Sequence, residues 1–393
     1  MKFTLGSVTV IADGPGVMVH TPPLLLQLQQ VGYDVDVAAT PSAALFTTPY
    51  APALLTGHPA ARWPLPDTAL TPNRAILLAP SSLNAFKALP ADERQRLENS
   101  PAGLIVAPAL LPDDTPSDAL DEWRHLASPR WLIAPPTAHT PLGALGDILV
   151  ASPETCVEWV RRWQTPQDLA GRRILITAGP TAEDIDPVRY LTNRSTGRMG
   201  GSLARIAARR GAAVTVVHGP LSCPLPDLPG ITPVPVRSAQ QMFDAVDAHL
   251  NHCDVAILCA AVADYAPATY SELKLKKSDR GDRPHTLWDM PDALPLRRTP
   301  DILAHLGSLS PRPFLVGFAA ESDHIEENAR LKLMRKGCDL LCANDITEPG
   351  SGFAVHTNRV TVFTRSGDIH RLPQLDKDDV ARKILDLVAE ALG

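Results

Sequence analysis

Residues 174–200 read ILITAGPTAEDIDPVRYLTNRSTGRMG and predict a strand, a tight turn, a polar loop and the start of a helix. The apolar run 174–176 is typical of a buried strand, and the Gly-Pro dipeptide after it interrupts any regular element. Small residues then recur from Met199 to Arg210, which favours a helix packed closely on a sheet. Because the first turn of a helix presents free backbone N–H groups, we expect this helix to face a phosphate.

Length and composition narrow the class of protein. The chain has 393 residues, enough for two domains with separate cores. Its formal net charge is -6, so it lacks the basic surface of a nucleic-acid-binding protein. No apolar stretch approaches the roughly 20 residues of a membrane span. The six cysteines lack the spacing of a zinc site, which favours reduced thiols in the cytoplasm. We expect a cytoplasmic protein with neither nucleic-acid nor membrane partners.

Apolar runs alternate with helix-like segments along both halves of the chain, as in parallel sheets with crossover helices. A polar segment, 161–172, separates the two halves. The fold class expected is α/β, with two doubly wound Rossmann-like domains. The first domain, residues 1–165, is expected to be flavodoxin-like or flavoprotein-like, and the second spans residues 166–393. The expected strands are 8–12, 35–39, 75–79, 103–107, 131–134, 174–177, 213–217, 255–259, 314–318, 340–343 and 359–363.

Two further segments of the second half follow predicted strands. They are Ala260-Ala-Val-Ala-Asp-Tyr265 and Val316-Gly-Phe-Ala-Ala-Glu321. Because open α/β sheets bind ligands at the carboxyl ends of their strands, both segments are candidates for a binding site.

Two groups of lysines complete the pattern. Lys274, Lys276 and Lys277 concentrate positive charge as a triphosphate site requires, although a solvated loop explains them equally well. Lys332 and Lys336 lie four residues apart on one predicted helix face, where surface pairing with the preceding glutamates is an alternative.

Together and in this order, these segments resemble the phosphopantothenate–cysteine ligase domain of the bifunctional coenzyme A biosynthesis flavoproteins, over residues 171–392. The resemblance implies that CTP activates the carboxylate of 4'-phosphopantothenate, giving an acyl-cytidylate and pyrophosphate. The amine of L-cysteine would then attack the acyl carbon and release CMP. Mg²⁺ is expected with CTP, held mostly by phosphate oxygens and water, so no protein metal ligand is assigned.

The resemblance also implies roles for individual residues. Asn193 would polarise and hold the acyl-cytidylate, Arg189 would anchor the loop or the substrate phosphate, and Lys274 would lie beside the developing charge. Read alone, Asn193 would be a turn or capping residue. Arg198 stands where the family commonly has lysine, so the charge is kept. The implied CTP-binding residues are Ala261, Val262, Ala263, Asp264, Lys274, Pro300, Asp301, Ile302, Phe318, Lys332 and Lys336.

The first half resembles the flavin-binding decarboxylase domain of the same family, through residues 23–56, 79–84 and 107–109. The resemblance places Pro66, Leu111 and Leu142 at the family's catalytic histidine, asparagine and flap cysteine. Proline and leucine cannot transfer a proton or hold a carboxylate. We therefore expect the fold to be kept and the decarboxylase to be lost.

The turn predicted after the first strand is unfavourable for flavin binding. Asp13 would face the FMN phosphate unfavourably there, unless the loop is rearranged and the side chain points away. The alternative is a fully bifunctional enzyme that also decarboxylates its product with FMN.

Two other classes of protein share features with this sequence. Tyr270 and Lys274 are spaced as in short-chain dehydrogenases, but no glycine-rich dinucleotide motif follows the first strand. A chain that has lost one activity could also be a regulatory scaffold. The family resemblance further implies a homo-oligomer with a dimer formed through the ligase domain.

Overall fold

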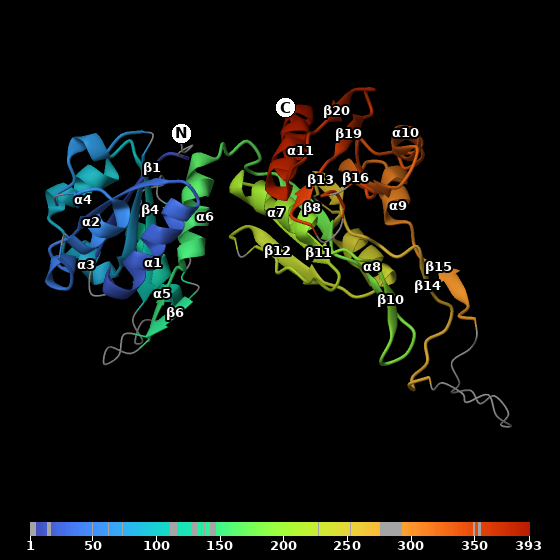
Figure 1. The fold of residues 1–393 in the computed structure, drawn as a ribbon, viewed down its shortest axis with the longest axis horizontal. Coiled ribbons are helices and arrows are strands. Elements are labelled where there is room, and N and C mark those ends of the chain that lie inside the picture. The colour runs from blue at the N-terminus through green and yellow to red at the C-terminus, as the bar shows by residue number, and fades with distance from the viewer. Residues whose placement is uncertain are drawn as a thin grey trace. The chain divides into compact units, whose positions relative to one another are not determined.

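The computed structural model describes residues 5–13, 17–48, 50–61, 63–72, 74–110, 116–126, 132–134, 136, 138–141, 147–226, 228–251, 253–275, 293–348, 350–352 and 355–393. The chain divides into two compact units, Met1–Pro166 and Gln167–Gly393, which are described separately (Figure 1). The expected boundary lay between residues 165 and 166. Within the described residues, no helix has the length and apolar character needed to span a bilayer.

The second unit carries the opening sequence stretch. Its elements are β8 (Arg173–Ala178), β9 (Ala182–Asp184), β10 (Tyr190–Thr192), α7 (Arg198–Arg209), β11 (Ala213–His218), β12 (Ile231–Pro235), α8 (Ala239–His249), β13 (Val255–Leu258), β14 (Tyr265–Pro267), β15 (Leu296–Arg298), α9 (Ile302–Ser308), β16 (Phe314–Glu321), α10 (Ile325–Arg335), β17 (Leu340–Asp345), β18 (Thr357–Asn358), β19 (Thr361–Thr364), β20 (Ile369–Arg371), β21 (Leu375–Asp376) and α11 (Lys377–Leu392).

The main sheet of this unit runs in the order β12-β11-β8-β13-β16-β17-β19-β20. The strands from β12 to β17 are parallel, whereas β19 and β20 are antiparallel additions. Taken in chain order, the parallel strands follow the 3-2-1-4-5-6 arrangement of the doubly wound nucleotide-binding fold. In this arrangement the chain reverses its direction of winding between β8 and β13.

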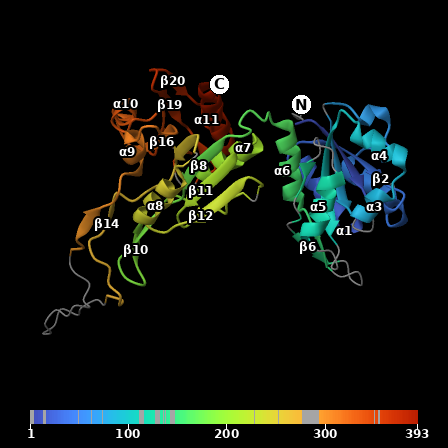
Figure 2. The same cartoon turned by 180° about the vertical axis from the view of Figure 1, so that it is seen from behind.

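Helices cover both faces of the sheet because strand β8 is apolar on both sides. Ile174 and Ile176 belong to the core that α7 and α11 cover, and Leu175 belongs to the core that α8, α9 and α10 cover on the other face. Figure 2 shows these helices around the sheet. The period of two along a strand sends alternate side chains to opposite faces, so a wholly apolar strand requires two layers of helices.

The first unit is a second α/β layer structure. Its elements are β1 (Ser7–Ala12), α1 (Val17–Gln30), β2 (Asp34–Ala39), α2 (Tyr50–Thr56), β3 (Arg74–Ser81), α3 (Leu83–Lys87), α4 (Ala91–Glu98), β4 (Gly103–Leu110), α5 (Pro116–Leu126), β5 (Leu132–Ile133), β6 (Ala138–Pro141), β7 (Asp147–Val150) and α6 (Pro153–Gln164). Its parallel strands follow the flavodoxin-like order β2-β1-β3-β4-β5, and the antiparallel β7 and β6 extend it. The expected fold class is confirmed for both units.

Several short elements differ from expectation. The predicted polar loop after β8 contains an antiparallel hairpin, β9–β10, and a similar hairpin, β14–β15, follows β13. Strand β12 also lacks an apolar run, because it lies at the sheet edge and carries two prolines. Strands of three residues are too short to show a periodic pattern, which is why the sequence did not reveal them.

Close packing of α7 on β8 depends on one glycine. A Cβ atom on Gly200 would lie 2.5 Å from the Cβ of Ala178, whereas one on Gly201 would meet nothing nearer than Pro226 Cδ at 3.9 Å. Both glycines lie in the first half of α7.

We therefore predict opposite effects for two alanine substitutions. Gly200→Ala should lower the free energy of unfolding of the second unit by about 1–3 kcal/mol, because helix and strand must separate. Gly201→Ala, the matched control, should raise it by about 0.5–1 kcal/mol, because alanine restricts the unfolded chain without a clash. Urea unfolding followed by circular dichroism measures both. Equal effects would contradict close packing at Gly200.

Candidate active site

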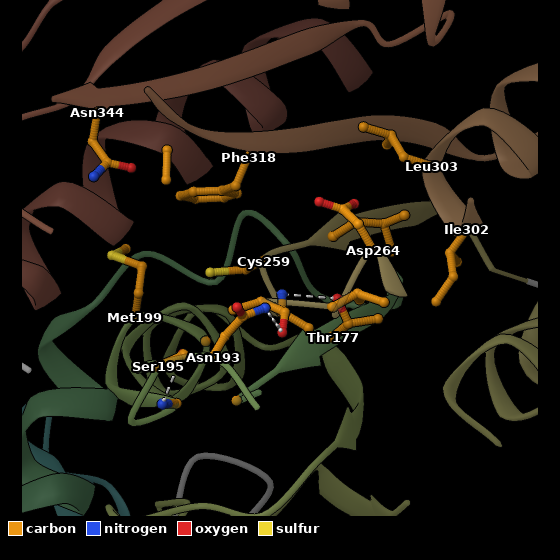
Figure 3. A pocket seen from close by; sticks show the side chains of 18 of the residues that line it. Thr177, Asn193, Ser195, Met199, Cys259, Asp264, Ile302, Leu303, Phe318 and Asn344 are labelled. Carbon is orange, nitrogen blue, oxygen red and sulfur yellow. Dashed lines mark hydrogen bonds between the residues drawn. The ribbon is translucent and has the colours of Figure 1, made fainter. Parts of the chain in front are cut away.

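A pocket of about 780 Å³ lies at the carboxyl ends of β8 and β13, where the winding of the second unit reverses. Open α/β sheets bind ligands at this position because the connections leave the two strand ends in opposite directions and open a crevice. Figure 3 shows Met199 and Asn344 on one side of the pocket and Ile302 and Leu303 on the opposite side.

Backbone hydrogen bonds hold the two strand ends together. Ala261 N donates to Gly179 O at 2.9 Å, and Thr181 N donates to Ala261 O at 3.3 Å. The buried hydroxyl of Thr177 accepts a hydrogen bond from Ala260 N at 3.1 Å. These bonds extend the strand pairing past the regular sheet, so the two loops form one rigid floor.

Asn193 reaches this floor from the loop before α7. Its Nδ2 donates to Ala261 O at 2.9 Å, and the hydroxyl of the preceding Thr192 donates to Thr181 O at 2.8 Å. An amide nitrogen carries two hydrogens, so Asn193 retains a second donor for a ligand. Its side chain is thus not simply a local turn or cap contact.

The opposite end of the pocket contains a charged pair. Asp301 caps α9 through a bond from Ala304 N at 3.0 Å, and its other oxygen accepts from Lys336, the C-cap residue of α10. Burial would raise the pKa of Asp301, but the hydrogen bonds from Lys336 and Ala304 leave it below the usual value. Lys336 therefore faces the pocket with its charge largely balanced.

Most of the predicted catalytic and nucleotide-binding residues line this one pocket, although they come from five separate segments. Lys332 and Lys336 make no ion pair with Glu326 within the described residues, because Glu326 pairs with Arg330 and Arg371. The predicted residues that line the pocket are Asn193, Ala261, Val262, Asp264, Pro300, Asp301, Ile302, Phe318, Lys332 and Lys336.

Ala263, Arg189 and Lys274 do not line the pocket. Ala263 is buried behind the wall, with its N–H donating to Thr181 Oγ1 and its carbonyl accepting from Thr299 Oγ1. Lys274 is exposed, and Lys276 and Lys277 lie outside the described residues.

Arg189 is part of a separate network in the turn that connects β9 to β10. It donates to the buried carboxylate of Asp186 and, at 2.6 Å, to Leu275 O. These bonds and the backbone N–H groups of Val188, Arg189 and Leu275 hold the pKa of Asp186 far below its usual range, although burial opposes the shift. Of the two roles expected for Arg189, these contacts favour anchoring of the loop.

Several pocket residues were not predicted from the sequence. Asn344 lies one residue before the carboxyl end of the buried strand β17, so the rule that placed residues 260–265 and 316–321 could have found it. Asn358 and Lys377 come from the antiparallel strand β18 and the first turn of α11, and no local signal marks them. The other pocket residues not predicted individually are Thr177, Gly179, Ser195, Thr196, Gly197, Arg198, Met199, Gly200, Leu258, Cys259, Ala260, Tyr265, Arg298, Thr299, Leu303, Ala320, Ile346 and Gly352.

The dehydrogenase-like pair finds no support in this geometry. Tyr270 is 55% exposed, and neither it nor Lys274 belongs to the pocket. In the part of the chain that the structure describes, no three His, Cys, Asp or Glu side chains gather as metal ligands.

The first unit places Asp13 at the carboxyl end of β1. Its carboxylate is buried and accepts from the hydroxyls of Thr40 and Ser42, each at 2.6 Å. Pro66 precedes a short 3₁₀ turn, while Leu111 and Leu142 lie outside the described residues.

Comparisons with known proteins agree with this organisation. The DNA/pantothenate metabolism flavoprotein C-terminal domain family matches residues 169–392. The coenzyme A biosynthesis bifunctional protein CoaBC of Vibrio cholerae serotype O1 is 35% identical over 391 residues, 94% of this chain and 94% of that protein. CoaBC of Escherichia coli K12 is 34% identical over 406 residues, covering 97% of this chain and 96% of that protein. The crystal structure of a CoaBC C-terminal domain is 39% identical and covers 57% of this chain and 98% of that one, with a TM-score of 0.48.

The matched domain places the second unit in a class of pantothenate-metabolism flavoproteins. Because the relatives align along both units, the chain belongs to the family of coenzyme A biosynthesis bifunctional proteins CoaBC. The resemblance expected from the sequence is thereby confirmed. The chain is an enzyme of coenzyme A biosynthesis whose second unit is the family's ligase domain, and its first unit is related to the flavin-binding half.

The floor of the pocket can be tested at Thr177. Thr177→Val removes the acceptor of the Ala260 N–H group and should lower the free energy of unfolding by about 1–3 kcal/mol. Thr215→Val is the matched control, because Thr215 lies on the neighbouring strand β11 and its hydroxyl makes no hydrogen bond within the described residues. It should change stability by less than about 0.5 kcal/mol. Urea unfolding that finds both variants equal would contradict this role for Thr177.

Proposed function

We propose that the second unit ligates L-cysteine to 4'-phosphopantothenate with CTP, through an acyl-cytidylate. The observation that carries the proposal is that one pocket at the β8–β13 switch point brings together predicted residues from separate segments. They are Asn193, Ala261, Val262, Asp264, residues 300–302, Phe318, Lys332 and Lys336. A pocket of about 780 Å³ has room for a nucleotide and a second substrate.

In the first step, a carboxylate oxygen of phosphopantothenate bonds to the α-phosphorus of CTP. The bond between that phosphorus and the oxygen bridging to the β-phosphate breaks, and pyrophosphate leaves with the electron pair. In the second step, the amine of cysteine attacks the acyl carbon and loses a proton, and CMP leaves. Attack of the amine on a free carboxylate would have to expel an oxide ion, whereas attack on the acyl-cytidylate expels CMP, a far better leaving group. The carboxylate must therefore be activated first.

The pocket residues support distinct roles in these steps. Asn193, fixed by Ala261 O, has one N–H left to donate to the acyl carbonyl oxygen as charge develops there. The Asp301–Lys336 pair, Phe318 and Lys332 form the nucleotide end of the pocket. Lys274 is proposed to meet charge on the phosphates, and this role rests on the sequence motif because the side chain lies outside the pocket.

Mg²⁺ is proposed to accompany CTP, whose phosphate charge it would neutralise. No acidic cluster fit to cage the ion gathers among the described side chains, which favours coordination by phosphate oxygens and water. The protein's own contribution is to place basic groups and amide donors around the nucleotide.

Turnover of the purified chain tests the ligase directly. With 4'-phosphopantothenate, L-cysteine and Mg-CTP under anaerobic conditions, we expect equimolar pyrophosphate and phosphopantothenoylcysteine. Asn193→Ala should lower kcat by about 10²-fold or more, as loss of one oxyanion donor does, with a smaller effect on the KM for CTP. Asn251→Ala, at an exposed position after α8, is the control and should leave kcat unchanged. Absence of pyrophosphate from the wild-type chain would remove the ligase proposal.

The first unit is proposed to have lost the decarboxylase and to bind no FMN. An FMN phosphate at the end of β1 would meet the buried Asp13 carboxylate, and the hydroxyls of Thr40 and Ser42 already donate to that carboxylate. Pro66 can supply neither a proton nor a hydrogen-bond donor. A fully bifunctional enzyme would need to bind the FMN phosphate at a position other than the end of β1.

The visible absorbance spectrum distinguishes a first unit that binds FMN from one that does not. The chain purified from cells and then titrated with FMN should show no bound flavin, because the carboxylate repels the phosphate. Asp13→Asn, which removes the charge and keeps the shape, should gain affinity for FMN if Asp13 alone blocks binding. A yellow wild-type protein that converts phosphopantothenoylcysteine onward to phosphopantetheine would establish the bifunctional alternative.

A homo-oligomer with a dimer through the ligase domain is also proposed. The hairpins β9–β10 and β14–β15 pack against each other through β9 and β14. They and the adjoining loop expose apolar side chains, which supports burial against a second chain. These side chains are Val188, Tyr190, Tyr265, Tyr270, Leu273 and Leu296. The absence of any disulfide among the six cysteines supports a proposed cytoplasmic location.

A further inference from the structure

The pocket contains a buried ammonium group that no carboxylate neutralises. Lys377, the first residue of α11, is 5% exposed and lines the pocket. Its Nζ donates to Gly352 O at 3.1 Å, and no acidic side chain lies within ion-pair distance among the described residues. An ammonium carries three hydrogens, so two donors remain for other acceptors.

Arg198 adds a second positive charge to the same end of the pocket. Its guanidinium Nη1 contacts His356 Nδ1 at 3.1 Å, and the backbone N–H of Lys377 donates to the carbonyl of His356 at 3.2 Å. The Nε of Arg198 is buried without a hydrogen-bond partner, and within the described part of the chain Arg198 forms no ion pair. His356 therefore links the two cations.

Asn358 contributes a neutral donor beside them. Its Oδ1 accepts from Ser351 Oγ, Gly352 N and Arg359 N, at 3.0, 3.2 and 3.1 Å. The two N–H donors fix the orientation of the amide, so Nδ2 is the atom left over. Asn358 is 4% exposed and lines the pocket, and Nδ2 meets no acceptor within the described chain.

This combination is unfavourable without a ligand. Buried charges in proteins are normally paired, and burial together with the nearby Arg198 lowers the pKa of the Lys377 ammonium. The carboxylates that line the pocket, Asp264 and Asp301, come from the loop after β13 and from the cap of α9. Lys332 is also unpaired within the described residues, but it is only half-buried, so water can solvate it.

We propose that Lys377, Arg198 and Asn358 form an anion subsite that binds a phosphoryl group of a substrate. Arg198 is the first residue of α7, and the amino end of this helix also lines the pocket, so its backbone N–H groups add to the positive potential. The subsite deepens the proposed ligase function and rests on it for the identity of the ligand.

Two phosphoryl groups could occupy the subsite. One is the pyrophosphate part of CTP, and the other is the phosphate ester of 4'-phosphopantothenate. If the nucleotide base lies at the Asp301–Lys336 end, the phosphate chain runs toward Lys377. Lys377 and Arg198 would then stabilise the charge that reaches the pyrophosphate oxygens when the bond to the α-phosphorus breaks.

Binding of inorganic pyrophosphate to the full chain tests the subsite without turnover. Isothermal titration calorimetry should find the affinity of Lys377→Gln reduced at least about tenfold, with Lys377→Arg restoring most of it. Glutamine can still donate to Gly352 O, so the loop contact is kept. The matched control is Lys383→Gln, at an exposed position on the same helix, which should bind pyrophosphate as the wild type does.

Kinetics of the same variants identify the ligand. A raised KM for CTP and weaker product inhibition by pyrophosphate would assign the subsite to the nucleotide. A raised KM for 4'-phosphopantothenate, with pyrophosphate binding unchanged, would assign it to the phosphate ester. If Lys377→Gln changes neither the affinity for pyrophosphate nor the KM for either substrate, the proposed subsite is wrong. A lower unfolding temperature with no change in binding would mean that Lys377 has only a structural role. If the wild type binds pyrophosphate through Lys377 but has no ligase turnover, the subsite stands and the ligase proposal fails.

Discussion

The bridge between the carboxyl ends of β8 and β13 is the constraint on which the site depends. Two parallel strands diverge into loops that leave in opposite directions. Backbone hydrogen bonds from Ala261 N to Gly179 O and from Thr181 N to Ala261 O keep those loops together at the point of divergence. Glycine permits this approach at residue 179, where φ is 75°. The side chain of Asn193 donates to the carbonyl of Ala261 as well. The polar loop before α7 and the loop after β13 are therefore joined at this carbonyl.

The charged side chains at the two ends of the pocket come from different helices and loops. The loop after β13 and helices α9 and α10 bring acidic groups and lysines, of which Asp301 and Lys336 neutralise each other. The amino ends of α7 and α11 bring Arg198 and Lys377, and no carboxylate from either helix end is among the residues that line the pocket. A long polyanionic ligand can be oriented by such an arrangement, because one end offers balanced polar contacts and the other a net positive potential.

The two units show how one architecture can keep or change its binding site. Both are doubly wound sheets. In the second unit the first strand is followed by a turn and a loop that lead to the amino end of α7. In the first unit the corresponding position holds Asp13, whose buried charge is satisfied by Thr40 and Ser42. The buried carboxylate of Asp13 would oppose an anionic ligand at this strand end.

The sequence by itself determined the fold class, the main strands and the pocket segments at strand ends, because alternating apolar periods and turn residues are local signals. It also singled out residues 260–265, since they follow a predicted strand, whereas Asn193 was singled out only by the resemblance to the ligase family. Only the tertiary structure decided that Lys274 and Arg189 lie outside the pocket and that Lys377 and Asn358 lie within it. Lys377 is about 180 residues from Arg198 in sequence, and their proximity depends on α7 and α11 packing on one face of the sheet. No local pattern encodes such a contact, so the charge at that end of the pocket is a property of the packed domain.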